Sequence, residues 1–302
     1  MGKTIDRRSF LKLGAASAGA AVGCRRSEAE RTTDEAPAKM RYRQLGSTGL
    51  EVSEISFGAH GVDNPTLMAA SLEAGINTFC TSGRYLDGRE ETALGEAIAR
   101  IGTPRDKIVI MTGNDLRPNE TVDSWLEDLD ASLQRLRTDY LDIFYNAMVQ
   151  TPDEVLSDVV FEAFDKARQA GKVRHLAVSG HHGGLQDCLE AALGAEHYEV
   201  FFTKYDFVSY PDQDQLLRRA AKRGIGTMVF KTNAGNRQQE IKDLEAGGLS
   251  FTQATIRWAR STPCVASVAM TLKTFDQIDE AVAAVSSGPS AAEVAMLRRY
   301  AE

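Results

Sequence analysis

The sequence is poor in cysteine and has no long hydrophobic run. Its 302 residues contain 4 cysteines, Cys24, Cys80, Cys188 and Cys264. The three beyond Cys24 are odd in number and widely spaced, which is neither a disulfide framework nor a zinc-binding pattern. The chain also lacks a basic patch with interleaved aromatic residues, and its net charge of -7 argues against a nucleic-acid partner.

The N-terminal region is typical of a twin-arginine export signal. Arg7 and Arg8 precede a run of about 11 small or apolar residues, too short for a membrane span of about 20. This run has no polar face, which disfavours an amphipathic helix. Cys24 follows Ala-Val-Gly, so cleavage with lipidation of Cys24 and cleavage without it both stay open. We predict an exported chain that is either periplasmic or, if Cys24 is lipidated, tethered to the membrane through that anchor alone and facing outward.

The remaining sequence divides into a linker and one large domain. Residues 25–39 are rich in charge, Thr, Ala and Pro, which is typical of a disordered linker between the signal peptide (1–24) and a domain at 40–302. From Leu50 onward, short β-rich runs alternate with helical stretches, and residues 122–136 carry apolar side chains at helical spacing. Eight strands are predicted, at 55–58, 78–80, 108–112, 141–145, 173–178, 200–204, 226–230 and 265–269. Eight such units favour a closed parallel barrel, although an open doubly wound sheet gives a similar alternation.

Several motifs resemble those of aldo-keto reductases. They include Arg-Tyr-Arg-Gln-Leu-Gly-Ser-Thr-Gly-Leu at 41–50, Gly-Ile-Asn-Thr-Phe-Cys-Thr-Ser-Gly-Arg-Tyr at 75–85, Asp-Tyr-Leu-Asp at 139–142 and Gly-Lys-Val-Arg at 171–174. The resemblance covers nearly all of residues 40–286. It implies a (β/α)8 TIM barrel of the aldo-keto reductase type and an NAD(P)-linked oxidoreductase.

The resemblance also predicts a degenerate catalytic site. The family uses a Tyr as proton donor, a Lys that lowers its pKa, an Asp paired with the Lys, and a His that orients the carbonyl. Tyr85 matches the Tyr, whereas the Asp, Lys and His positions read Cys80, Gly113 and Ala147. Losing Asp and Lys together is self-consistent, because one buried charge without its partner costs about 3–5 kcal/mol. We therefore expect carbonyl reduction by the family mechanism to be severely impaired, and Tyr85 to be either a residual site residue or a packing residue.

The cofactor positions are mixed. By resemblance, five residues belong to an NADP or NAD site: Ser179, Phe230, Lys231, Lys273 and Gln277. Two further positions have changed, because Gly180 replaces an Asn and Phe202 replaces a Gln that hold the nicotinamide in the family.

Other residues suggest replacements for the lost groups. Lys204 lies two residues from Phe202, and so on the same face of its strand, where it could supply the missing cation near Tyr85. His60, Cys80, His181 and His182 follow strand ends, where they could form a metal or thiol site. Three functions stay open: an oxidoreductase with a rebuilt acid–base group, an inactive barrel that binds a small molecule or partner at its mouth, and new chemistry at Cys80 and the histidines.

Overall fold

The computed structural model describes residues 38–181, 183–208, 210–233, 250–288 and 290–298. The predicted signal peptide and residues 25–37 of the predicted linker lie outside this range, as does His182. Among the described residues, no helix combines the length and apolarity needed to cross a membrane.

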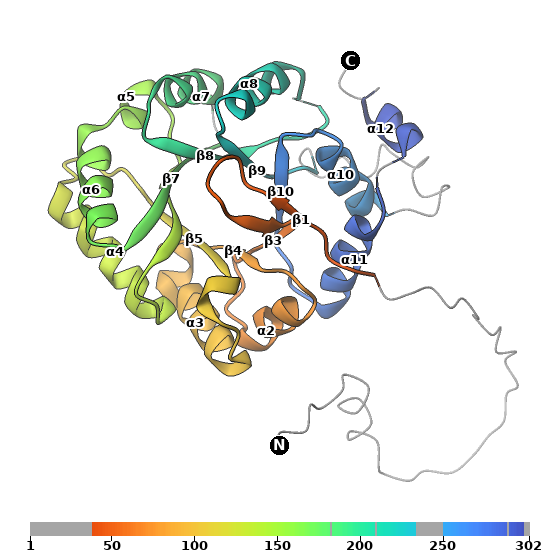
Figure 1. Ribbon diagram of the computed structural model, residues 1–302, viewed down its shortest axis with the longest axis horizontal. Coiled ribbons are helices and arrows are strands. Elements are labelled where there is room, and N and C mark those ends of the chain that lie inside the picture. The colour runs from red at the N-terminus through yellow and green to blue at the C-terminus, as the bar shows by residue number, and fades with distance from the viewer. Residues whose placement is uncertain (1–37, 182, 209, 234–249, 289, 299–302) are drawn as a thin grey trace, which may run out of the picture. The chain divides into compact units, whose positions relative to one another are not determined.

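Eight parallel strands close into a barrel, which confirms the prediction (Figure 1). Around the barrel the order is β10-β3-β4-β5-β6-β7-β8-β9. The strands are β3 (Ile55–Gly58), β4 (Thr78–Cys80), β5 (Val109–Asp115), β6 (Leu141–Ala147), β7 (Val173–Gly180), β8 (Tyr198–Lys204), β9 (Gly226–Phe230) and β10 (Val265–Met270).

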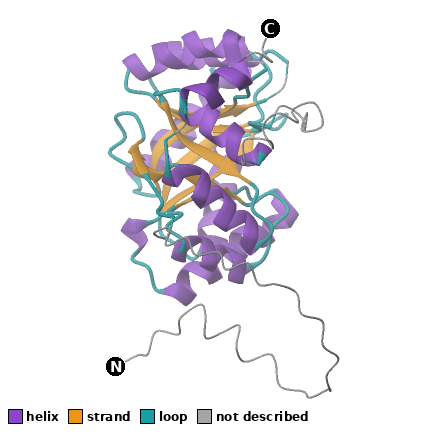
Figure 2. Ribbon diagram, turned by 90° about the vertical axis from the view of Figure 1, so that its right-hand side faces the viewer, coloured by secondary structure: helices purple, strands orange, loops and turns teal. Residues whose placement is uncertain are grey.

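Helices surround the strands on the outside, as Figure 2 shows. The α-helices are α2 (Pro65–Glu73), α3 (Arg89–Ile101), α4 (Val122–Leu136), α5 (Pro152–Val155), α6 (Asp158–Gln169), α7 (Leu185–Gly194), α8 (Tyr210–Lys222), α10 (Phe251–Arg260), α11 (Phe275–Ser286) and α12 (Ala291–Arg298). In the part of the chain that the structure describes, the short 3-10 helices are η1 (Tyr85–Gly88) and η2 (Arg105–Lys107). Helix α4 illustrates the local logic: Thr121 and Ser124 form a capping box at its start, and Trp125, Leu129 and Leu133 turn inward from it at helical spacing.

A hairpin and a buried ion cluster close the amino end of the barrel. Strands β1 (Tyr42–Gln44) and β2 (Glu51–Ser53) pair antiparallel just before β3. Arg43 Nε lies 2.7 Å from the buried carboxylate of Glu54, which also pairs with the buried Arg260. Parallel barrels of this kind place ligands at the opposite end. We call that end, where the strands have their carboxyl termini, the barrel mouth.

Side chains from alternate strand positions fill the barrel interior. The buried members of this inner cluster are Leu45, Val52, Cys80, Val109, Met111, Ile143, Tyr145, Ala147, Ala177, Val200, Phe202, Met228, Ala266 and Ala269. Ala147 ends β6, and Tyr145 and Phe202 lie two residues before the ends of β6 and β8, so all three lie near the mouth.

Candidate ligand site at the barrel mouth

The positions that correspond to the family's catalytic groups meet at the barrel mouth. Cys80 ends β4, and Tyr85 follows five residues later in η1. Gly113 lies near the end of β5 and pairs in register with Tyr145 of β6, whose last residue is Ala147. The structure therefore brings the four aligned positions to neighbouring strands.

Tyr145 occupies the space beside Gly113. A Cβ atom placed on Gly113 would lie 2.1 Å from the carbonyl oxygen of Tyr145, and 2.6 Å from Cγ and Cδ2 of its ring. These separations are far inside van der Waals contact, so only glycine fits at this point of β5. The lysine position has therefore been lost together with the room for its side chain. Tyr145 is not among the site residues predicted from the sequence, although it lies on the same face of its strand as Ile143, two residues earlier.

The phenol groups of Tyr85 and Tyr145 influence each other's pKa, and we call these two residues the tyrosine pair. Tyr145 Oη donates to the carbonyl oxygen of Thr81 at 2.6 Å. Burial raises the pKa of Tyr85, the contact with Tyr145 lowers it, and the nearby Glu90, Cys80 and Asp115 raise it further. The net direction is upward, opposite to what a proton donor with a neighbouring lysine requires.

Cys80 is a poor candidate for thiolate chemistry in this position. Its side chain is buried, and burial raises the pKa of the thiol well above its ordinary value, against a smaller opposing effect of a hydrogen bond with Ser56. A thiol that stays protonated at neutral pH is neither a strong nucleophile nor a metal ligand.

His60 packs against Tyr85 with its ring edge-on, at 4.9 Å between ring centroids. His181 lies elsewhere on the mouth: its Nδ1 is 3.1 Å from Lys231 Nζ, and its ring meets Phe230 edge-on. Among the described residues, no group of three or more His, Cys, Asp or Glu side chains could hold a metal ion.

Glu90 is a buried acid that the sequence analysis did not single out as a site residue. Its Oε1 accepts a hydrogen bond of 2.5 Å from the backbone N–H of Gly61, next to His60. Burial raises the pKa of Glu90 to about 7, with Asp63 adding to the effect, while backbone hydrogen bonds and Arg89 oppose it. Glu90 lies in the first turn of α3 next to the charged Arg89 and Glu91, so the sequence gives no local sign of its burial.

Lys204 forms an ion pair with Asp206, at 3.1 Å between Nζ and Oδ2. Partial burial lowers the pKa of Lys231, and the positive charge of the nearby Lys204 lowers it further. The side chains that shift the pKa of Tyr85 are Tyr145, Glu90, Cys80 and Asp115. Lys204 therefore acts on the side of the mouth formed by β8 and β9, and its predicted role beside Tyr85 gains no support.

The positions for a nicotinamide carboxamide no longer suit that group. Ser179 is kept and buried, but a Cβ placed on Gly180 would come within 3.2 Å of Val149 and Leu185, so an Asn side chain has little room. Phe202, at the former Gln position, contacts Phe230 at 4.6 Å and Tyr145 at 5.8 Å between ring centroids. The rings present apolar surface where amide partners are required. Phe230 itself remains half-buried and offers a ring for stacking.

Two further predicted cofactor residues, Lys231 and Lys273, follow the carboxyl ends of β9 and β10. Lys231 is exposed at the end of β9 and adopts a left-handed backbone conformation, with φ of 56°. Lys273 Nζ reaches to 3.9 Å from a Cβ placed on Gly61. Gln277 has a structural task, because its Oε1 accepts from Lys273 N–H at 2.7 Å at the start of α11. Residues 234–249, which follow Lys231 closely along the chain, lie outside the described residues.

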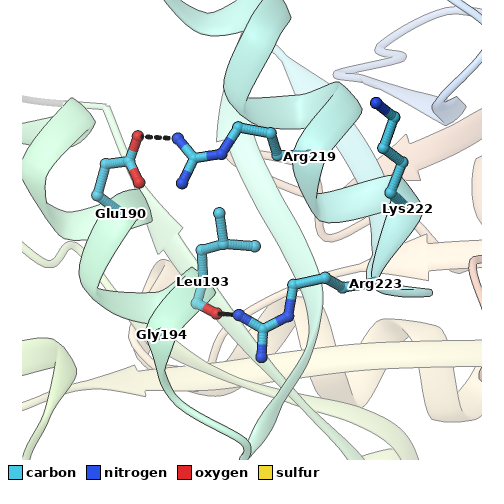
Figure 3. A pocket seen from close by; sticks show the side chains of 6 residues that line it. All are labelled: Glu190, Leu193, Gly194, Arg219, Lys222 and Arg223. Atoms are coloured by element: carbon cyan, nitrogen blue, oxygen red, sulfur yellow. Dashed lines mark hydrogen bonds and ion pairs between the residues drawn. The ribbon is translucent and has the colours of Figure 1, made fainter.

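A separate pocket lies on the barrel wall between α7 and α8, away from the mouth (Figure 3). Its cavity volume is about 370 Å³, and it is lined by Glu190, Leu193, Gly194, Arg219, Lys222 and Arg223. Arg219 pairs with Glu190 at 2.6 Å, and Arg223 donates to the carbonyl oxygen of Leu193 in the last turn of α7. These contacts link α7 to α8 and satisfy a carbonyl group in the last turn of α7. The charged residues that make these contacts therefore have a structural role.

The barrel and its mouth define a class of TIM-barrel proteins that place ligands at the carboxyl ends of the strands. A family model described as "Aldo/keto reductase family" matches residues 62–246, more than half of the chain. The chain belongs to the aldo-keto reductase family.

Similar proteins agree with this assignment. A "Putative voltage-gated potassium channel subunit beta" of Schizosaccharomyces pombe is 33% identical over 206 residues, which cover 62% of this chain and 56% of the relative. The "Uncharacterized oxidoreductase YqkF" of Bacillus subtilis is 23% identical over 290 residues, covering 82% of this chain and 92% of the relative. The solved structure of "aldo-keto reductase AKR11C1 from Bacillus halodurans (holo form)" has a TM-score of 0.74, with 22% identity and coverage of 87% and 97%.

The match to the first of these relatives is partial. The chain spans little more than half of the length of the Schizosaccharomyces pombe protein. Similarity at 22% identity to the Bacillus halodurans structure supports the fold alone.

Proposed function

We propose that this member of the aldo-keto reductase family binds a small molecule at the barrel mouth and does not reduce carbonyl groups by the mechanism of that family. The observation that carries the proposal is the space beside Gly113, which Tyr145 fills and a lysine cannot enter. Without that lysine, burial and acidic neighbours raise the pKa of Tyr85. A weaker acid donates its proton less readily in the transition state.

The orienting group is missing as well. Ala147 is buried at the end of β6, where the family has a histidine. A methyl group there supplies no hydrogen bond to hold a carbonyl against Tyr85. Two contributions to catalysis are therefore absent from the same site, the tuned proton donor and the oriented substrate.

Aldo-keto reductases generally use NAD(P)H, which supplies a hydride when bound. Lys231 and Lys273 would hold its phosphates, and Phe230 would stack on its ring. The residues around Gly180 and Phe202 do not fit its carboxamide. We therefore infer weak binding of NADP or NAD through the phosphate end, and we assign no chemical step to the nucleotide.

The predicted export supports the same function. Outside the cytoplasm there is no ready supply of reduced nicotinamide to recharge a cofactor that dissociates. A barrel that binds a ligand without turnover works there, whereas an ordinary reductase does not. This argument rests on the proposed twin-arginine signal and on release or tethering at Cys24.

The test combines nucleotide binding with turnover. The chain is titrated with NADPH and NADP⁺, following tryptophan and nicotinamide fluorescence, and then assayed for NADPH oxidation with a panel of aldehydes and ketones. We expect binding weaker than micromolar and no oxidation above the level of a Tyr85→Phe variant. NADPH oxidation that depends on a carbonyl substrate and disappears in Tyr85→Phe would refute the proposal.

A further inference from the structure

The pocket between α7 and α8 has the size and the charge of an anion site (Figure 3). Its cavity volume of about 370 Å³ lies within the range of roughly 300–1,000 Å³ that small-molecule sites occupy. Arg219 and Lys222 line it from the last turn of α8, and Arg223 follows that helix directly. Glu190 of α7 is the one acidic residue in the lining.

The structural contacts of the pocket explain two of the three cations. Arg219 pairs with Glu190, and Arg223 donates to the carbonyl oxygen of Leu193. A guanidinium group has five N–H donors, so both arginines keep donors for a further acceptor. Lys222 is exposed and makes neither a hydrogen bond nor an ion pair with a residue that the structure describes. The structural role of the pocket therefore leaves the Lys222 ammonium group unexplained.

The charge of the lining stays positive after every opposing charge is counted. Helices α7 and α8 both end at the pocket, and a helix C-terminus is equivalent to about half a negative charge. Glu190 contributes one more negative charge. Three cationic side chains outweigh these groups by about one positive charge. A phosphate monoester carries a charge of about −1.5 to −2 at pH 7 and has three acceptor oxygens, so it complements this lining.

One wall of the pocket is open at Gly194. A Cβ atom placed on this residue meets nothing within 4 Å. The residue ends α7 without a left-handed backbone conformation, so a larger side chain fits its backbone. The space beside Gly194 is therefore available to the carbon atoms of a ligand whose charged group lies among the cations.

We propose that this pocket binds the phosphate group of a phosphate ester through Arg219, Lys222 and Arg223. Planar guanidinium forks and an ammonium group are the donors that match phosphate oxygens. A soluble ester and the head group of an anionic lipid both offer this group. The inference goes beyond the proposed function and does not rest on it, because the pocket lies away from the barrel mouth.

The test titrates the full chain with glycerol 3-phosphate in a phosphate-free buffer at constant ionic strength. Nuclear magnetic resonance follows the arginine Nε–Hε signals, which Arg219→Lys and Arg223→Lys variants assign. We expect both signals to shift with saturation, and glycerol, which lacks the phosphate, to leave them unchanged.

Lys222→Met measures the contribution of the unpaired cation. We expect this variant to raise the Kd for glycerol 3-phosphate at least about fivefold, because it removes a charge-assisted hydrogen bond. The matched control is Lys107→Met, which removes an exposed lysine of η2 that pairs with Asp106. This control makes the same change in net charge and should bind the ester like the unaltered chain.

Two further variants separate binding from the structural role of the pocket. Glu190→Gln removes the opposing charge and keeps an oxygen that can accept from Arg219, so we expect the Kd to fall roughly twofold or more. A purely structural pocket predicts no such gain. Gly194→Leu keeps every charge but fills the open wall, and we expect it to weaken binding of the ester.

Vesicles of phosphatidylglycerol and of phosphatidylcholine distinguish the source of the phosphate group. Saturable shifts with glycerol 3-phosphate that Lys222→Met weakens identify a soluble ester. Sedimentation with phosphatidylglycerol vesicles alone, reduced by Lys222→Met and without a response to glycerol 3-phosphate, identifies a lipid head group. No response to either probe, or equal effects of Lys222→Met and Lys107→Met, would overturn the inference. None of these results changes the carbonyl-turnover assay, which tests the proposed function separately.

Discussion

At the scale of single residues, Gly113 explains the absence of the family's lysine, because Tyr145 occupies the space that a lysine side chain would need. We predict that Gly113→Ala lowers the free energy of unfolding by about 2 kcal/mol or more, because a Cβ atom 2.1 Å from the Tyr145 carbonyl forces β5 and β6 apart. Gly113→Lys should be at least as destabilising and should not restore carbonyl reduction. Urea denaturation followed by circular dichroism measures the stability.

The matched control for this prediction is Gly194→Ala at the end of α7, where a Cβ atom meets nothing within 4 Å. That variant should be neutral or more stable by up to about 1 kcal/mol, as expected for alanine in a helix. Equal stability of the two alanine variants would show that the space beside Gly113 is not restrictive.

Glu90 gives the second prediction at this scale. Burial raises the pKa of Glu90 from 4.5 to about 7. Between these values the folded chain keeps a proton that the unfolded chain has released. Its contribution to stability is therefore full below about pH 4.5 and falls as the pH rises to 7, with a slope of up to about 1.4 kcal/mol per pH unit.

The pH dependence is tested by urea denaturation between pH 5 and 8. Glu90→Gln should remove this component of the slope, whereas Glu96→Gln, at an exposed carboxylate on the same helix, should leave it unchanged. An identical slope in the Glu90→Gln variant and the unaltered chain would contradict the assignment.

At the scale of elements, the loop that carries Tyr85 is fastened by helices α3 and α4. Glu91 of α3 is fully buried and accepts hydrogen bonds from Thr112 Oγ1 and Arg135 Nε, both at 2.6 Å. The Arg135 side chain lies over Gly83 and Gly88, where a Cβ atom would come within 2.6 Å of it. One guanidinium thus joins α4, α3 and the segment between β4 and α3.

We predict that Arg135→Met lowers the free energy of unfolding by about 3–5 kcal/mol, because it leaves the Glu91 carboxylate buried without its charge partner. Arg137→Met, which breaks the exposed pair with Glu96, should cost less than about 1 kcal/mol. Chemical denaturation of both variants provides the comparison. The double variant Glu91→Gln/Arg135→Met should recover part of the loss, and no recovery would show that packing of the arginine is what matters.

The elements were more predictable than the site. Strands β3, β4 and β9 agree with the predicted ranges, because buried apolar runs between turn residues define them locally. Strands β5 and β6 run on to Asp115 and Ala147, since their pairing continues through Asn114 and Asn146, which a local pattern does not reveal. The tyrosine pair depends on the register between β4, β5 and β6, so Tyr145 could be found only by asking what fills the space beside Gly113.

At the scale of the whole molecule, the proposed function depends on where the chain resides. Twin-arginine signals are addresses that a receptor reads, so conservative loss of the pair should stop export. We predict that Arg7→Lys/Arg8→Lys leaves the chain in the cytoplasm of a bacterium with a twin-arginine pathway. Cell fractionation and mass spectrometry of the N-terminus measure the location and the cleavage, and a lipid-sized mass increase on Cys24 distinguishes anchoring from release.

The sequence itself contains the matched control for export. Arg25 and Arg26 form a second arginine pair just after Cys24. Arg25→Lys/Arg26→Lys makes the same chemical change on the far side of the proposed cleavage point, and this variant should be exported like the unaltered chain. If both lysine variants reach the exterior equally, the chain does not use the twin-arginine route. If instead the unaltered chain stays in the cytoplasm, the lack of a cofactor supply no longer argues against reductase turnover, and the space beside Gly113 carries that conclusion alone.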